Sequence, residues 1–442
     1  MTAMTIVGGT LVSAEGQRRG NILIDEGRFV AVGDVDARGE VIDATGLFVM
    51  PGMVDTHVHL MDPGDTERED FPSGTRAAAA RGVTTIVEHT HSHPVRSPGD
   101  LREKRAHLDG RANVDFGLAA HVWPDRIDQI DGLEAEGISF HKIFTCDTHG
   151  VPGLAGESLR TALAAVAVAD GRCLIHNEDQ ILTFEAERRL RRADRNDPSL
   201  LTEWRSREAE LKAVGETAAL VLETGVVATF AHVSSPEVLD VIEAYRDLGA
   251  DIAAEACPQY FALDEDEVAE HGALRKFTPP ARIRDETERA AMWAAVSRGG
   301  FSHFSTDHAP STIDQKRAGG FWDAPFGLPG LDTTMPFLLD AALRGQMTLS
   351  DLTRLYASAP AQRYRLRKGA IAAGVDADLV LVDPEGSWKV DDTTIISKAR
   401  WSPYSGRTFR GRIVATYLRG EEVARDGVCH DLRTGRFTRP HR

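Results

Sequence analysis

The sequence has few cysteines and no long apolar run. Its four cysteines lie far apart and form no CxxC pair: Cys146, Cys173, Cys257 and Cys429. That spacing favours free thiols in a reducing compartment over a disulfide framework or a cysteine zinc site. The N-terminus has no basic segment followed by an apolar one, and no run approaches the roughly 20 apolar residues of a membrane span. We therefore expect a cytoplasmic protein without membrane contact.

The chain also lacks an excess of positive charge. Its formal net charge is -16, whereas a nucleic-acid-binding surface needs Lys and Arg to neutralise phosphates. This balance argues against a nucleic-acid partner and favours a small-molecule ligand. With 442 residues, of which 42% are hydrophobic, the chain can bury a large core and is longer than one ordinary domain.

The middle of the chain alternates short apolar strands with Ala-rich helical stretches. Eight strands are predicted, the number that closes a barrel: 53–60, 83–89, 113–121, 138–145, 172–177, 226–233, 251–257 and 302–307. Because each is followed by a helical or loop segment, the pattern predicts an α/β fold, a (β/α)8 TIM barrel.

The two chain ends resemble each other and differ from the middle. Both contain short β-like pieces and glycine turns, so we expect residues 1–51 and 366–442 to form one small β-sandwich domain and residues 52–365 to form the barrel. The segment 178–212 is rich in Glu and Arg and too long for a tight loop. It predicts either a helical excursion near the mouth of a site or a solvated charged face.

His57 and His59 are the first candidates for a metal site. They follow the apolar run 47–50 and are separated by one residue, so on a strand both side chains point to the same face. In an α/β barrel the carboxyl ends of the strands carry the chemistry. A His-x-His pair alone also fits core or surface histidines, so other residues must decide.

Four more candidates stand at the ends of predicted strands: Lys142, His176, His232 and Asp307. Taken singly, the histidines could be core residues, Lys142 could extend to solvent, and Asp307 could cap a helix. Together with His57 and His59 they should converge on one rim of the barrel. Lys142 lies among apolar residues, so it should lose its proton or be modified; carbamylation by carbon dioxide would make it an anionic bridging ligand.

Several longer motifs carry a resemblance to a known family. They are PGMVDTHVH at 51–59, GTRAAAARGVTT at 74–85, EACPQY at 255–260, KFTPPAR at 276–282, DHAP at 307–310 and GVDADLV at 374–380. In these the chain resembles the amidohydrolase superfamily, in the cyclic amidohydrolase branch of hydantoinases (dihydropyrimidinases), allantoinases and dihydroorotases. The resemblance spans nearly the whole chain and implies a metal-dependent hydrolase that is a homotetramer or homodimer.

The resemblance also implies roles for the candidates. His57, His59 and Asp307 would hold one divalent ion, His176 and His232 the other, with N6-carboxylated Lys142 and a hydroxide between them. Two such ions activate water and polarise a carbonyl, and Asp307 would pass the proton of the water to the departing ring nitrogen. Imidazole and carboxylate ligands suit Zn2+ first, with Mn2+, Co2+ or Fe2+ as alternatives.

Departures from the family pattern indicate which substrates are expected. Met61, His91 and Ser311 stand where dihydroorotases have an Arg, an Asn and a His that bind a carboxylate, and Asp147 stands where hydantoinases have a Tyr. His91 and His93 could touch substrate or be ordinary loop residues. We expect the segments 61–72, 144–155 and 311–330 to line the mouth, with Phe321 and Trp322 as apolar walls.

We therefore expect hydrolytic opening of the C–N amide bond in a neutral cyclic ureide, imide or lactam, of the hydantoinase or allantoinase kind. The alternatives are a dihydroorotase, a hydrolase of linear amides or esters, and a non-enzymatic scaffold. A complete set of metal-competent residues opposes the scaffold, and loss of the arginine at Met61 opposes dihydroorotate, because a charge-assisted grip contributes about 1.5–3 kcal/mol.

Overall fold

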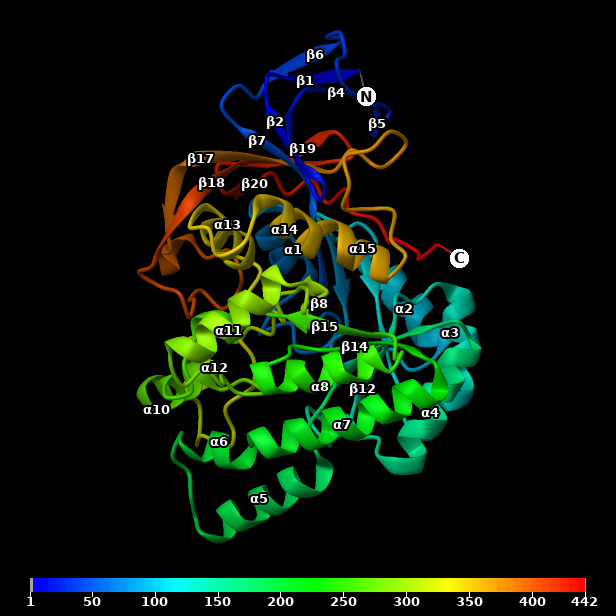
Figure 1. Ribbon diagram of the computed structural model, residues 1–442, viewed down its shortest axis with the longest axis vertical. Coiled ribbons are helices and arrows are strands. Elements are labelled where there is room, and N and C mark those ends of the chain that lie inside the picture. Colours follow the sequence, from blue (N-terminus) through cyan, green and yellow to red (C-terminus); the bar gives the residue numbers. More distant parts are fainter. Residues whose placement is uncertain (1–2, 442) are drawn as a thin grey trace.

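A closed ring of parallel strands forms the body of the protein. The computed structural model describes residues 3–441 (Figure 1). Neighbouring strands pair in parallel throughout, and a parallel bridge between Val58 and His308 brings the two ends of the ring together. The strands are β8 (Met53–Val58), β9 (Val83–Glu88), β10 (Asp115–Leu118), β11 (Ala120–His121), β12 (His141–Phe144), β13 (Arg172–His176), β14 (Val227–Phe230), β15 (Ile252–Ala256) and β16 (His303–Phe304). β10 and β11 lie within one predicted strand, so the TIM barrel is confirmed.

Helices cover the outside of the ring. Capping residues place their starts: the side chain of Asp70 accepts a hydrogen bond from the Ser73 amide at the start of α1, and Ser235 does the same for Val238 at the start of α8. The covering helices are α1 (Phe71–Ala80), α2 (Pro98–Leu108), α3 (Ile130–Glu136), α4 (Gly156–Val168), α7 (Arg207–Thr224), α8 (Pro236–Asp247), α11 (Glu286–Ser297), α13 (Thr334–Leu343), α14 (Leu349–Thr353), the π-helical turn η3 (Arg354–Ser358) and α15 (Ala359–Arg363). Within the described residues, every helix is too short or too polar to span the bilayer.

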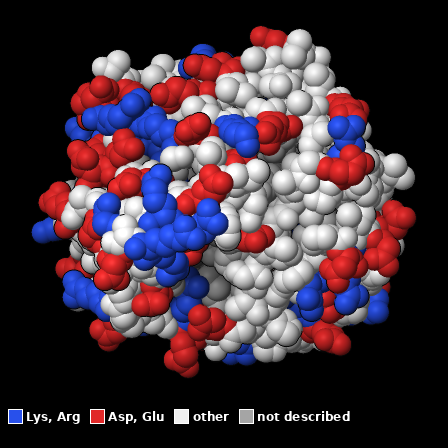
Figure 2. Space-filling view, turned by 90° about the horizontal axis from the view of Figure 1, so that it is seen from below, with Lys and Arg blue, Asp and Glu red and all other residues white. Residues whose placement is uncertain are grey.

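The charged segment after β13 forms a helical excursion, one of the two alternatives predicted for it. It folds into α5 (Gln180–Arg192) and α6 (Leu200–Trp204), which lie at the lower end of the molecule in Figure 1. Their apolar side chains pack with Val268 and Phe321 from the segment that holds α9 (Gln259–Ala262), α10 (Glu267–His271) and α12 (Ile313–Arg317). Viewed from this end, Figure 2 shows a compact group of Lys and Arg among Asp and Glu, beside a broad area of uncharged residues.

The chain ends build two sheets above the barrel (Figure 1). The first has the order β5-β4-β1-β6 and the second β20-β19-β18-β17-β7-β2-β3. A common core holds them together, with Ile6 and Ile24 from one sheet against Leu379 and Tyr417 from the other. The strands are β1 (Met4–Val7), β2 (Thr10–Ser13), β3 (Gly16–Arg19), β4 (Asn21–Asp25), β5 (Arg28–Gly33), β6 (Glu40–Asp43), β7 (Phe48–Pro51), β17 (Leu379–Lys389), β18 (Thr408–Leu418), β19 (Glu421–Arg425) and β20 (Val428–Cys429). The predicted β-sandwich of both ends is confirmed as part of the fold.

The first passage from the sheets into the barrel is a single residue, whereas the chain returns to the sheets through residues 364–378. β7 ends at Pro51 and β8 begins at Met53, while the Gly52 amide donates to Asp378 O at 2.9 Å. A Cβ at Gly52 would lie 2.1 Å from Thr84 Oγ1, which explains the glycine. The domain limits 51/52 and 365/366 stay a prediction, and residues 1, 2 and 442 lie outside the described range.

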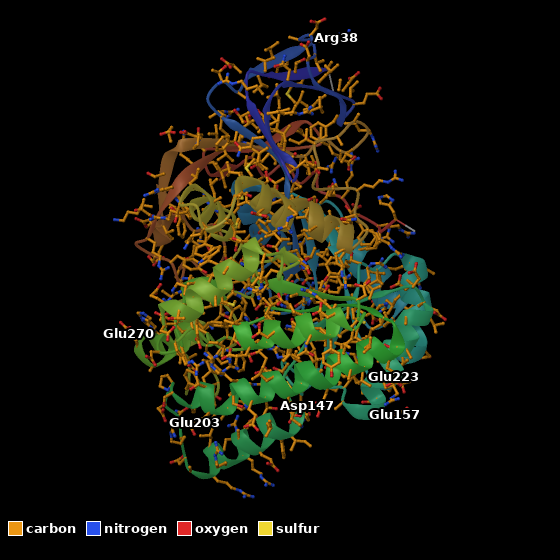
Figure 3. All side chains as sticks on the ribbon, viewed as in Figure 1. Arg38, Asp147, Glu157, Glu203, Glu223 and Glu270 are labelled. Carbon is orange, nitrogen blue, oxygen red and sulfur yellow. The ribbon has the colours of Figure 1, made fainter. Side chains whose placement is uncertain are left out.

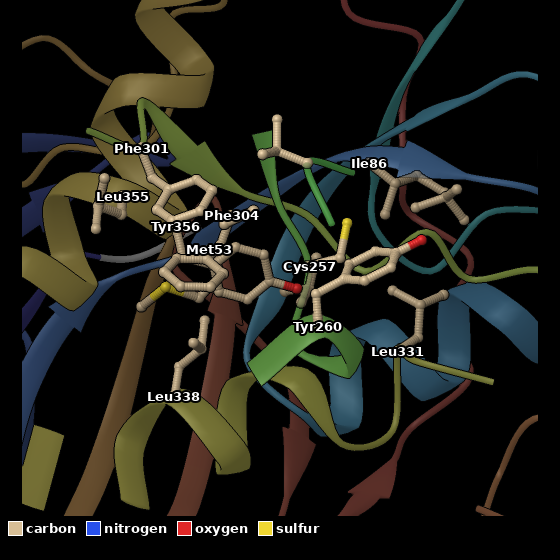
Figure 4. Close-up of a cluster of buried hydrophobic side chains, with 14 of the residues drawn as sticks. Met53, Ile86, Cys257, Tyr260, Phe301, Phe304, Leu331, Leu338, Leu355 and Tyr356 are labelled. Atoms are coloured by element: carbon tan, nitrogen blue, oxygen red, sulfur yellow. The ribbon is translucent and has the colours of Figure 1, made fainter. Parts of the chain in front are cut away.

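A buried apolar cluster joins β8, β15 and β16 to the helices α13 and η3 (Figure 4). Met53 and Phe304 lie against Leu338 and Tyr356 in this layer. The Tyr356 hydroxyl donates to Asp55 Oδ2 at 2.9 Å, so the ring contributes to the core while its polar end is paired. This layer fixes β8, the strand that carries His57.

A buried ionic group connects the barrel with the terminal sheets. Lys368 Nζ lies 2.6 Å from Asp115 Oδ2, 2.8 Å from Asp376 Oδ2 and 2.9 Å from Asp378 Oδ2. Burial disfavours the charged lysine, yet the three carboxylates raise its pKa above the ordinary value. Removing the cation would leave buried Asp378 without an ion pair among residues 3–441 and would leave Asp115 with Arg419 alone.

We therefore expect Lys368→Met to destabilise the protein by about 3–5 kcal/mol, as for other buried ion pairs that lose one partner. The measurement is the shift in the urea midpoint and in Tm. Lys389→Met, at an exposed position of β17, is the control and should stay within about 0.5 kcal/mol of the wild type. Equal stability of the two variants would contradict the role given to the ionic group.

Candidate metal centre

The six candidate ligands lie at the carboxyl ends of barrel strands and line one cavity. His57 and Lys142 are in β8 and β12, His176 ends β13, and His59, His232 and Asp307 follow β8, β14 and β16. Parallel strands all end at one rim, so residues far apart in the chain come together there. His232 and Asp307 have φ values of 38° and 50°, a backbone region that is uncommon for residues other than glycine and frequent at functional sites.

One group of donor atoms surrounds Asp307. Its Oδ1 lies 3.2 Å from His57 Nε2 and 3.5 Å from His59 Nε2, and Lys142 Nζ lies 3.3 Å from the same His57 nitrogen. Two donors bound to one tetrahedral ion at about 2.0–2.1 Å would lie roughly 3.3 Å apart. The spacing of Asp307 Oδ1 to the two imidazole nitrogens therefore fits a shared cation, and Lys142 Nζ lies close enough for a carboxyl group on it to reach the same ion.

A second group is formed by His176 and His232. His176 Nδ1 and His232 Nε2 face each other at 2.9 Å, and both side chains are buried. Lys142 lines the same cavity, so it lies in reach of both groups. The arrangement supplies two nitrogen donors beside the first group, which fits a second ion.

Buried acceptors fix the ring orientations. His57 Nδ1 donates to Glu255 Oε2 at 2.8 Å, and His59 Nδ1 donates to His89 O at 2.8 Å, so each presents Nε2 to the cavity. His176 donates from Nε2 to Glu178 Oε2 at 2.7 Å and so presents Nδ1. Partners of this kind orient metal-binding imidazoles and raise their basicity.

The sequence did not single out these carboxylates, although Glu255 begins the motif EACPQY and Glu178 begins the charged segment 178–212. Glu255 is the penultimate residue of β15 and also accepts from the His232 amide at 2.9 Å. Glu178 accepts from Thr278 Oγ1 at 2.8 Å and from Arg205 Nη1 at 3.1 Å. Although burial favours the neutral acids, Arg205 and His176 hold the pKa of Glu178 at about 2, and His57 and His303 hold that of Glu255 well below its usual range. Both stay anionic acceptors.

The protonation states suit metal binding. Burial, reinforced by neighbouring cationic groups, lowers the pKa of His59 and of His232 well below the usual value, so both imidazoles are neutral at pH 7. Burial lowers the pKa of Lys142 to about 8, which increases the fraction of neutral amine available for reaction with carbon dioxide. Asp307 differs, because burial raises its pKa against the opposing effect of His57 and Lys142, which suits proton transfer rather than metal binding.

The three histidines after β9 have different surroundings. His89 is buried against the rings of His57 and His59, at centroid distances of 4.6 Å and 4.3 Å. His91 lines the cavity and stacks on His149 at 4.5 Å, with its Nδ1 3.2 Å from His121 Nε2. His93 is exposed to solvent, away from the cavity wall.

Of the other predicted substrate contacts, Met61 lines the cavity, whereas Asp147 and Ser311 do not. Asp147, labelled in Figure 3, is exposed and accepts hydrogen bonds from the Gly153 amide at 2.7 Å and from Gln180, the first residue of α5. Ser311 is fully buried and accepts from Arg68 Nε at 2.9 Å, so it touches a cavity residue rather than the cavity itself.

The three predicted loop segments each contribute to the cavity wall. Met61 and Arg68 come from the first, Phe144 and His149 from the second, and Phe326 and Gly327 from the third. The prediction that Phe321 and Trp322 form walls of the cavity is wrong, because both pack with Trp204 of the excursion. Aromatic side chains are stabilised more by packing against other rings than by facing water. Arg68 and His149 had no signal in the sequence.

Comparison with known proteins agrees with the family resemblance of the sequence. A family profile described as "Amidohydrolase family" matches residues 48–423. The chain is 34% identical to an allantoinase of Rubrobacter xylanophilus over 100% of its own length and 99% of the relative, and 34% identical to a dihydroorotase of Halobacterium salinarum over 89% and 91%.

The fold comparison adds solved structures of a third activity. An L-hydantoinase (dihydropyrimidinase) from Arthrobacter aurescens superimposes with a TM-score of 0.93 at 27% identity and covers 99% of this chain and 100% of that one. A dihydropyrimidinase from Brevibacillus agri gives a TM-score of 0.92 at 26% identity, covering 99% of each chain.

The orienting role of Glu255 can be tested on metal affinity. We expect Glu255→Gln to lower affinity for divalent ions about 10- to 100-fold, because the neutral amide no longer raises the basicity of His57. Metal bound per chain is measured by elemental analysis after equilibration with graded chelator. The exposed Glu185→Gln on α5 is the control. Unchanged metal retention in Glu255→Gln, with wild-type circular dichroism, would remove Glu255 from this role.

Proposed function

Because the chain belongs to the amidohydrolase family, we propose that it opens a cyclic amide by hydrolysis of a ring carbon–nitrogen bond. Its relatives named above are an allantoinase, a dihydroorotase and hydantoinases or dihydropyrimidinases, which all support a hydrolase of cyclic amides. The observation that carries the proposal is that the six candidate ligands line one cavity: His57, His59, Lys142, His176, His232 and Asp307.

We propose that His57, His59 and Asp307 hold one divalent ion and His176 and His232 a second, with N6-carboxylated Lys142 contributing to both. Zn2+ is the first choice for these donors, with Mn2+, Co2+ or Fe2+ as alternatives. When bound, the two ions would lower the pKa of water and polarise the substrate carbonyl. The spacing and neutral state of the donors described above support this assignment.

A residue of the chain, Asp307, can transfer the proton that ring opening requires. Asp307 faces the cavity with a side chain that is 12% exposed, and its pKa is raised by burial. The carboxylate can take the proton of the attacking water and donate it to the ring nitrogen as the bond breaks, which such groups accelerate about 10²–10⁴-fold. His91, Phe326 and Met61 form a wall that is neutral at pH 7 and suits a flat ring.

We propose a ring of the hydantoin or allantoin kind, with a dihydroorotase as the second candidate. The test uses zinc-loaded protein with hydantoin, dihydrouracil, allantoin, dihydroorotate, a simple imide and a lactam. We expect at least one ring to open, and we expect the activity to disappear with chelator and to return with Zn2+.

The variant Asp307→Asn should lose about 10²–10⁴-fold in kcat, because it cannot transfer the proton, while its circular dichroism stays that of the wild type. Near-normal kcat in Asp307→Asn would remove its proton-transfer role; no opened ring would contradict the function.

Carboxylation of Lys142 has a separate test. The neutral amine should take up carbon dioxide, so protein equilibrated with ¹³C-bicarbonate and Zn2+ should show one carbamate carbon resonance by NMR. Lys142→Arg should not show it, because an arginine stays protonated. Lys389→Arg, at an exposed site, should keep the signal. A signal in Lys142→Arg would place the carbamate elsewhere.

We propose a homotetramer or homodimer that works in the cytoplasm. Side chains on the outer helices support an assembly: Val168, Ile181 and Phe184 are 87%, 61% and 58% exposed. Among the described residues all four cysteines are free, which suits a reducing compartment.

A further inference from the structure

Arg68 is a positively charged residue in the cavity wall, and it is not one of the six candidate metal ligands. It comes from the loop between β8 and α1 and lines the same cavity as His57 and Asp307. Its side chain is only 18% exposed. A cation in this position costs free energy unless something pairs with it.

Uncharged atoms hold the guanidinium in place. Nε donates to Pro310 O at 3.1 Å and to Ser311 Oγ at 2.9 Å, and Nη2 donates to Phe326 O at 3.2 Å. These contacts fix the plane of the group between two loops. They bring no negative charge.

The nearest carboxylate leaves the charge largely uncompensated. Asp65 Oδ2 lies 3.9 Å from Nε, and that carboxylate is 46% exposed. By contrast, buried Arg205 lies 3.1 Å from Glu178. Burial lowers the pKa of Arg68, but a guanidinium stays protonated at neutral pH. Within residues 3–441, Nη1 has no hydrogen-bond partner, so one side of the planar guanidinium group can still bind an acceptor.

From this geometry, and resting on the proposed ring opening, we infer that the substrate carries a carboxylate substituent that Arg68 binds. A planar carboxylate matches the guanidinium fork and would compensate the charge that the chain leaves open. The ring would then lie between Arg68 and Asp307, against His91 and Phe326. Arg68 is thus a specificity-determining residue, and Ser311 is a positioning residue that acts through it.

This inference changes the expectation of a neutral ring. That expectation followed from Met61, which lacks a guanidinium, but Arg68 supplies one from further along the same loop. The rival explanation is that Arg68 only fastens the loop at Phe326. Lys276 does that from elsewhere, because its Nζ donates to the carbonyls of Phe321, Trp322 and Ala324 at 2.8, 3.0 and 2.6 Å.

The test uses matched substrates that differ only in charge: hydantoin acetic acid and its primary amide, and dihydroorotate and its primary amide. For zinc-loaded wild type we expect a higher kcat/KM with the acids. In Arg68→Gln the acid-to-amide ratio should fall about 10- to 100-fold, the loss typical of a hydrogen bond to a charged group. Arg68→Lys should recover part of the ratio, because it keeps the charge.

Lys276→Met is the matched control, since it loosens the same loop without changing a cavity charge. It should alter acid and amide equally. Calorimetric binding of the four compounds in an Asp307→Asn background gives the same comparison without turnover. A wild type that prefers the amides, or an Arg68→Gln ratio equal to that of wild type, would overturn the inference. Failure to open any ring contradicts the proposed function instead, and the binding series still decides the role of Arg68.

Discussion

The hydrogen bonds from buried imidazoles to buried carboxylates are the interaction on which the centre depends. Glu255 and Glu178 lie at strand ends, accept from His57 and His176, and so decide which nitrogen of each ring faces the cavity. Without them each ring could turn or change tautomer, and donor atoms spaced near 3 Å would no longer converge. The anions are stable there because Arg205 and the imidazoles compensate them. The orientation of these rings is therefore fixed by side chains of the barrel itself.

The architecture could be predicted because it follows from local patterns. Apolar strands such as 172–177 alternate with Ala-rich helices, and parallel strands end at one rim, so His176 and Asp307 could be expected to meet although they are far apart in the chain. The same reasoning identified the two-ended sandwich, since both ends show short strands and glycine turns. The likeness to amidohydrolases extended these expectations to the activity.

The substrate side of the cavity could not be predicted in the same way. Its walls come from loops, where no periodicity indicates the direction of a side chain. Arg68 faces the cavity because Pro310, Ser311 and Phe326 hold it, and those contacts cross more than two hundred residues of chain, the separation between 68 and 310. Trp322 turns away because the excursion offers it Trp204 and the carbonyl of Arg195. Such choices depend on long-range packing.

The single-residue passage at Gly52 has a mechanical meaning. The strand that carries His57 is the direct continuation of one that pairs with β17, and Gly52 is hydrogen bonded to Asp378 and packed on Thr84. A junction so short and so tightly packed leaves no room for a hinge. The sheets and the barrel are therefore held together tightly at this crossing, and the rim loops of Arg68, His149 and Phe326 are the parts of the cavity wall that can open to admit a reactant.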